Sequence, residues 1–187
     1  MTRRTVLSIA VALTLGACAD LSPQPTAHLP YDAVIGAGDP MRMAVTNTAN
    51  AFSSPDRLAG QPDRAARALA QMEYLAVEMP DNPRLGGLAP PREPFELARR
   101  EWREALGIPA GLPPQPVINA LYASARALSS GQSDAAAAAL PASVFPRGGT
   151  ATLTRLASLP ALPLTNQAAV IASDAMRRHD GQGRGRF

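Results

Sequence analysis

Cys18 is the only cysteine of the 187-residue chain, and its thiol is the most reactive side chain that the sequence offers. A thiolate can form a disulfide, bind a metal ion or act as a nucleophile. A disulfide within the chain is excluded because there is no second cysteine. The preceding residues, Leu15-Gly16-Ala17, end a short apolar run. The role of the thiol therefore depends on the nature of this apolar run.

The residues before Cys18 have the three parts of a secretory signal: a basic start at Arg3-Arg4, an apolar run over 6–15 and small residues before the cysteine. A run of ten residues cannot span a bilayer, which needs ~20. Leu15-Gly16-Ala17-Cys18 resembles the lipobox of bacterial lipoprotein precursors. The alternative is an ordinary Ala-x-Ala signal, but Leu15 then stands where a small side chain is needed.

The lipobox resemblance implies that Cys18 receives a diacylglyceryl group and that residues 1–17 are removed as a signal peptide. The first expected partner is therefore a lipid bilayer, in which each buried methylene contributes ~0.8 kcal/mol. Ala19 is not the Asp that retains many such lipoproteins in the inner membrane, so we expect the outer membrane, facing the periplasm. The segment Thr2-Arg3-Arg4-Thr5-Val6-Leu7 also resembles a twin-arginine signal, which leaves the export route open.

The charge of the chain is low once the leader is removed. All 18 basic residues are arginine, and loss of Arg3 and Arg4 lowers the net charge from +3 to about +1. This small charge on an exported protein predicts no nucleic-acid partner. A glycine-rich tail over 181–187 is expected to be disordered. Four C-terminal arginines could contact an anionic surface, or could simply be solvated: Arg177, Arg178, Arg184 and Arg186.

Groups suited to acid–base or metal chemistry are sparse. His28 lies in the expected tether and His179 near the C-terminus, so neither is placed on the expected body as a base or ligand. Two glutamate pairs could provide the paired carboxylates of a glycan hydrolase: Glu73 with Glu78, and Glu101 with Glu104. Neither pair has neighbouring aromatic and amide side chains to hold a sugar. The sequence therefore predicts no catalytic residue, no cofactor and no metal.

Proline and hydrophobic spacing predict an all-α fold. Residues 18–38 are expected to be a flexible tether, and residues 39–180 an irregular bundle of about six or seven helices. Prolines at first helical positions indicate helices over 40–53, 62–79, 94–106 and 116–130; three more are expected over 134–140, 150–159 and 165–179. The strongest prediction is 62–79, which has an apolar stripe at helical spacing: Ala65, Leu69, Met72, Leu75, Ala76 and Met79.

A sequence echo links the two halves of the body. Ser53-Ser54 followed by Gly60-Gln61-x-Asp63 is matched by Ser129-Ser130 followed by Gly131-Gln132-x-Asp134. Each copy is expected to form a helical hairpin. The echo can reflect duplication or chance in an alanine-rich chain. Its Gly-x-x-Asp-x-Ala-Ala spacing loosely resembles a tetratricopeptide turn, although two copies do not make an array. The resemblance favours protein binding over catalysis.

These features together predict a membrane-anchored periplasmic lipoprotein that acts as an interaction or scaffold module in the cell envelope. The expected partner besides the bilayer is an envelope protein or a cell-wall polymer. A cell-wall (peptidoglycan) hydrolase or its regulator is one alternative. An accessory subunit of an export or secretion assembly is the other.

Overall fold

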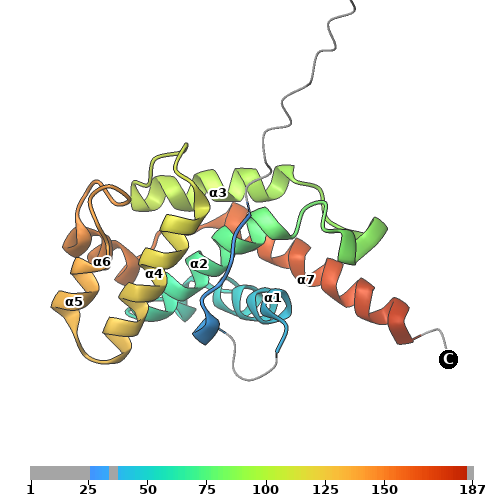
Figure 1. Cartoon of the computed structure of the whole chain (residues 1–187), viewed down its shortest axis with the longest axis horizontal. Coiled ribbons are helices and arrows are strands. Elements are labelled where there is room, and N and C mark those ends of the chain that lie inside the picture. Colours follow the sequence, from blue (N-terminus) through green and yellow to red (C-terminus); the bar gives the residue numbers. More distant parts are fainter. Residues whose placement is uncertain (1–25, 34–37, 185–187) are drawn as a thin grey trace, which may run out of the picture.

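The computed structural model describes residues 26–33 and 38–184 of the chain, with side chains through residue 182 (Figure 1). Over these ranges the fold is all-α, as predicted, with no strand. The helices are α1 (Pro40–Ala51), α2 (Pro62–Glu78), α3 (Glu93–Leu106), α4 (Pro114–Ser129), α5 (Ser133–Ala138), α6 (Gly149–Ala157) and α7 (Pro163–Arg184). Three short 3₁₀ helices join them: η1 (Tyr31–Ala33), η2 (Pro55–Arg57) and η3 (Pro83–Leu88). No described helix has the length and hydropathy needed to cross a bilayer.

The helix boundaries follow local signals in the sequence. Asp39 caps α1, where its Oδ1 accepts the Met41 amide at 2.9 Å and leaves fewer unpaired donors in the first turn. Proline occupies one of the first two positions of α2, α3 and α4. Gly107 ends α3 with a left-handed φ of 73°, a conformation that glycine adopts without steric cost.

α2 is the central helix of the bundle and packs against α4, α1, α6, α3 and α7 (Figure 1). The apolar stripe predicted for α2 is buried along its whole length. Trp102 and Phe95 of α3 are fully buried as well. Alanines occupy many of the other core positions, which allows the helices to approach closely. Ala105 and Leu128, both on the apolar faces of their helices, are only partly buried.

The predicted tether is wrong over residues 26–33, a segment that packs on the bundle and that we name the strap. Ala27 is fully buried, and its amide donates to Glu78 Oε1 at 2.8 Å. Gln115 pairs with both the amide and the carbonyl of His28, at 2.8 and 3.0 Å. The composition of this segment predicted a flexible spacer. The residues that bind it lie on α2 and α4, far away in sequence, so no local signal indicated these contacts.

The disordered tail predicted from Gly181 is also wrong over its first residues, because α7 continues to Arg184. Asp180, which precedes the first glycine of the tail, binds Arg42 of α1, with Arg42 Nη2 at 2.8 Å from its Oδ1. This contact joins α7 to α1 near the end that the sequence predicted for the helix. Residues 185–187 lie outside the described ranges.

The two turns of the sequence echo share one backbone geometry. Gly60 and Gly131 both adopt a left-handed φ, of 69° and 72°. The following residues, Gln61 and Gln132, have ψ values of 69° and 73°. Each turn joins two helices that contact one another, α1 with α2 and α4 with α5. The prediction of two helical hairpins is therefore confirmed.

Candidate functional site: a polar groove between α1 and α2

The residues proposed from sequence as contact sites are not brought together as one site. Cys18 and Arg186 lie outside the described residues. Arg177 pairs with Asp174 one turn earlier on α7, so its charge is partly neutralised. Arg178 is exposed on the same helix, and Arg184 is its last residue.

Glu73, one of the candidate hydrolytic carboxylates, belongs to a buried ionic cluster between α2 and α3. Its Oε1 accepts from Trp102 Nε1 at 2.8 Å and from Arg103 Nε at 2.6 Å. Its Oε2 accepts from Arg103 Nη2 at 2.9 Å and from Arg99 Nε at 3.1 Å. Arg103 Nη1 reaches the carbonyls of Pro109, Ala110 and Leu112. This cluster is fully hydrogen-bonded and holds α2, α3 and the following loop together.

Two further candidate carboxylates also bind backbone groups. Glu78 accepts the Ala27 amide of the strap. Glu101 accepts the amides of Leu164 and Thr165 at 3.1 and 2.8 Å, and so satisfies free donors at the start of α7. These contacts give both side chains a structural role. Within the described ranges, no group of three His, Cys, Asp or Glu side chains is arranged to hold a metal ion.

A groove of about 340 Å³ between α1 and α2 gathers polar side chains from several elements. Successive turns of α2 contribute Arg64, Arg67 and Gln71, which lie at the i, i+3 and i+7 positions of one helix face. α1 contributes Asn47 and Asn50 on the opposite wall. Tyr122 of α4 and Asp32 of the strap complete the polar lining. The rest of the lining is apolar and consists of Ala33, Met43, Ala51, Leu58 and Ala68. The groove thus combines several hydrogen-bonding groups from four elements in one concave site.

The floor of the groove is a buried polar pair. Gln71 and Tyr122 are only 3% and 2% exposed, and Gln71 Nε2 donates to Tyr122 Oη at 3.1 Å. Burial raises the pKa of the Tyr122 phenol, which therefore stays protonated and can donate its hydrogen. Among the described residues, Gln71 Oε1 and the Tyr122 hydrogen take part in no hydrogen bond besides this contact between the two side chains. The floor therefore presents one donor and one acceptor to a ligand.

The two arginines of the groove carry charge that no carboxylate neutralises within the described part of the chain. Arg64 donates to Gln61 Oε1 at 2.7 Å and Arg67 to Ser129 Oγ at 2.6 Å, and both acceptors are uncharged. Arg64 lies in the first turn of α2, where the helix dipole disfavours a cation by roughly 0.3–1 kcal/mol. Asp32 is the one acid among the described residues of the lining, and it is paired with Arg126 at 3.0 Å. The groove is therefore electropositive.

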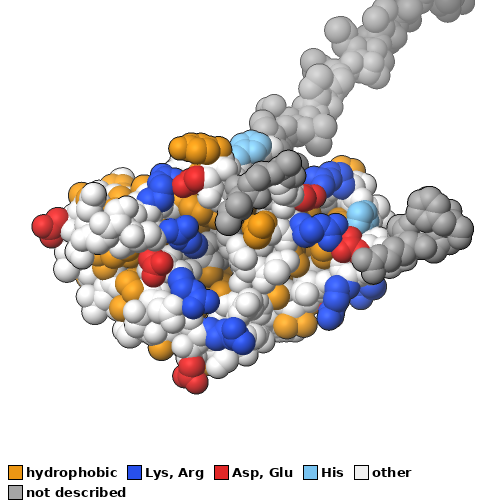
Figure 2. Space-filling model, turned by 90° about the horizontal axis from the view of Figure 1, so that it is seen from below, with side chains coloured by type: hydrophobic (Ala, Val, Ile, Leu, Met, Phe, Trp, Pro, Cys, Tyr) orange, Lys and Arg blue, Asp and Glu red, His pale blue; other side chains and the backbone are white. Residues whose placement is uncertain are grey.

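Figure 2 shows the underside of the molecule, which is the side where α1 and the start of α2 lie in Figure 1. Several basic side chains lie on this face, and carboxylates lie among them (Figure 2). Sequence reasoning did not single out Arg64 or Arg67 as contact residues. Their spacing with Gln71 was the available signal, but the facing asparagines of α1 could be placed only by the fold.

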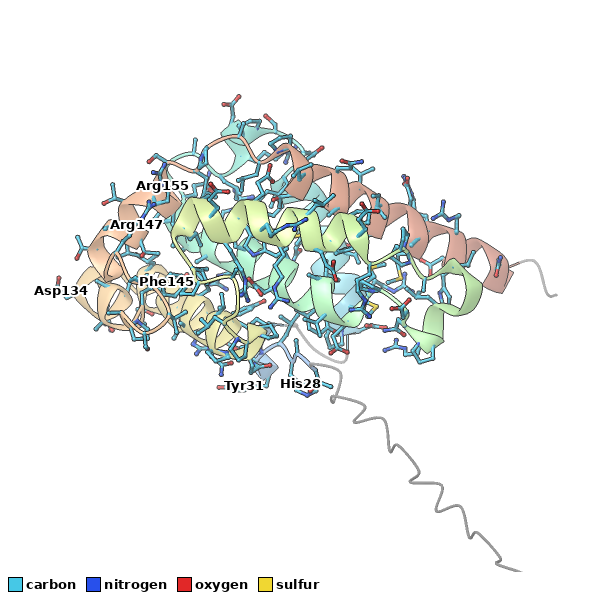
Figure 3. The ribbon with its side chains drawn as sticks, turned by 90° about the horizontal axis from the view of Figure 1, so that it is seen from above. His28, Tyr31, Asp134, Phe145, Arg147 and Arg155 are labelled. Carbon is cyan, nitrogen blue, oxygen red and sulfur yellow. The ribbon has the colours of Figure 1, made fainter. Side chains whose placement is uncertain are left out.

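A second groove, of about 690 Å³, lies beside the end of α3 and is lined by Arg100, Arg147 and Arg155. Figure 3 shows Arg147 and Arg155 close together at this end of the bundle. Glu101 and Glu104 line the same groove, so its charges are mixed. The Arg147 side chain lies against Gly107, with its Nε 3.0 Å from the position that a Cβ would take. There it complements the negative end of the α3 dipole, which explains its charge without a ligand.

No family model, no curated protein and no solved structure matches this chain. Its function must therefore be inferred from the residues and their geometry.

Proposed function

We propose that this chain is a lipid-anchored binding module of the bacterial cell envelope, which engages a partner through the polar groove between α1 and α2. The observation that carries the proposal is the pair of arginines, Arg64 and Arg67, which lack a carboxylate partner among the described residues and stand over a buried hydrogen-bonding floor. The lipobox at Cys18 supports the anchor, and the chemistry of the groove supports an anionic partner.

A binding role accounts for these features better than hydrolysis does. Three of the four candidate carboxylates hold the fold together through hydrogen bonds, namely Glu73, Glu78 and Glu101. By contrast, Asn47, Gln71 Oε1 and the Tyr122 hydrogen in the groove keep hydrogen-bonding capacity that no described residue uses. Unused hydrogen-bonding capacity at a concave site is what a ligand requires.

The anchor is tested by mass spectrometry of the chain purified from membranes, together with metabolic labelling by palmitate. We expect a mature N-terminus at Cys18 that carries acyl chains, and loss of the label in Cys18→Ser. A free thiol, or an intact leader on the membrane-bound protein, would contradict the anchor.

Partner binding is tested by a photo-crosslinking residue in place of Asn47 on the groove wall, in living cells. Thr154 on α6, which is also exposed, gives the matched control position. We expect a discrete adduct from position 47 that disappears in Arg64→Ala/Arg67→Ala. Equal adducts at both positions, or an adduct that persists without the arginines, would contradict a role for the groove.

A further inference from the structure

We infer that the polar groove between α1 and α2 binds a short peptide segment through its free terminal carboxylate. This inference rests on the proposed function and specifies the chemical class of the groove's ligand. The carboxylate would lie at the Arg64 and Arg67 end, and the last amide of the peptide would lie over Gln71 and Tyr122.

The arginines have no carboxylate partner among the described residues, and the second turn forms without arginines at the equivalent positions. Counting from the glycine of each turn, Arg64 and Arg67 correspond to Ala135 and Ala138 of α5. The second turn therefore keeps its geometry with a methyl group at both positions. Arg64 is exposed and Arg67 is half-buried, and both line the groove near the start of α2. Together they form a site for a planar anion that a guanidinium can bind in bidentate fashion.

The floor distinguishes between classes of anion. Gln71 Oε1 is an acceptor and needs a donor from the ligand, whereas the Tyr122 hydroxyl can donate its hydrogen. Inorganic phosphate mainly offers acceptors, and a neutral sugar offers no charge for the arginines. A peptide terminus combines a carboxylate, an amide N–H for Gln71 and a carbonyl for Tyr122.

The dimensions and the opposite wall fit the same ligand. A volume of about 340 Å³ is at the lower end of the ~300–1,000 Å³ range of ligand sites, which suits the last two or three residues of a chain. Asn47 is exposed on the α1 wall and has no hydrogen-bond partner among the described side chains. Its amide could pair with the peptide backbone.

Isothermal titration calorimetry of the full chain in detergent tests the inference. The probes are acetyl-Ala-Ala with a free carboxylate, the same peptide as its C-terminal amide, and inorganic phosphate. We expect the acid to bind, the amide to bind at least tenfold more weakly, and phosphate not to displace the acid. A parallel titration with the D-Ala-D-Ala form distinguishes a cell-wall peptide from a protein terminus, and binding of either acid supports the inference.

Matched variants locate the site. Arg64→Ala and Arg67→Ala should each weaken binding about tenfold, the expected loss of one charge-assisted hydrogen bond. Arg100→Ala/Arg155→Ala removes two exposed arginines from the other groove and should leave the affinity unchanged. Tyr122→Phe should weaken binding several-fold, and circular dichroism checks that each variant is folded.

Equal binding of the acid and the amide, or competition by phosphate, would overturn the inference of a peptide carboxylate. The absence of peptide binding by the folded chain would overturn it as well. If the crosslink from position 47 still depended on the arginines in that case, the proposed function would stand with a different ligand. If the crosslink from position 47 did not depend on the arginines, the proposed function would be contradicted as well.

Discussion

The two helical hairpins of this molecule share a turn and differ in the helix that leaves it. After Gly60, α2 runs from Pro62 to Glu78, whereas after Gly131, α5 runs only from Ser133 to Ala138. Pro141 comes soon after α5, at a position where a longer helix would need a backbone donor. The shared glycine-glutamine turn therefore specifies a hairpin, while the residues beyond it decide how long the second helix is.

The difference extends to chemistry. Equivalent positions carry Arg64 and Arg67 after the first turn, and Ala135 and Ala138 after the second. The first hairpin also contributes Glu73 to the buried ionic cluster, whereas α5 contributes no charged side chain to the core. On the first hairpin, Glu73 stabilises the fold, whereas Arg64 and Arg67 line the groove and have no counterpart on the second hairpin.

The largest expected effect comes from breaking the cluster that distinguishes α2. Glu73→Gln removes the charge that balances Arg103, whose side chain is 3% exposed. An uncompensated buried charge should lower the free energy of unfolding by about 3–5 kcal/mol, measured by urea denaturation. Glu104→Gln, at an exposed position of α3, is the control and should change it by less than about 0.5 kcal/mol.

The two turns should respond equally to loss of their glycines. Gly60→Ala and Gly131→Ala each place a side chain at a left-handed φ, with no atom within 4 Å of the new Cβ. We expect both to lower stability by about 1–2 kcal/mol through backbone strain alone, measured by urea denaturation. Gly111→Ala, where the Cβ is also free of contacts and φ is not left-handed, should be close to neutral. A large difference between the two turn variants would contradict the equivalence of the turns.

The smallest expected effect on stability concerns the arginines. Arg64→Ala/Arg67→Ala makes the first hairpin resemble the second, and it should change the free energy of unfolding by no more than about 0.5 kcal/mol. The reverse change, Ala135→Arg/Ala138→Arg, should be tolerated equally and should not create a peptide site, because α5 packs against α4 and α6 and Asn47 and Asn50 belong to α1. A large loss of stability in Arg64→Ala/Arg67→Ala would instead show that the arginines stabilise the fold.

The helices could be predicted from the sequence because their signals are local. Prolines at the first positions, Gly107 at the end of α3 and the apolar stripe of α2 each act within a turn or two of the chain. Asp39 stands directly before Pro40 in the sequence and caps α1. The strap and the end of α7 could not be predicted, because Glu78, Gln115 and Arg42 hold them from positions distant in sequence.

The candidate site could not be predicted from the sequence for a related reason. The groove needs α1 beside α2 and the hydroxyl of Tyr122 beneath Gln71, and no spacing rule connects residues 47, 71 and 122. In the sequence, Arg64 and Arg67 simply fall outside the apolar stripe of α2. Only the packed bundle makes their face of the helix one wall of a groove.

The strap determines how mechanical tension would enter the protein. Cys18 lies eight residues before Thr26, a distance that an extended chain spans with at most about 28 Å. Under the proposed anchoring, a pull from the bilayer would reach Ala27 and His28 first, and would be shared between Glu78 on α2 and Gln115 on α4. Force applied to the strap would then act as shear between α2 and α4.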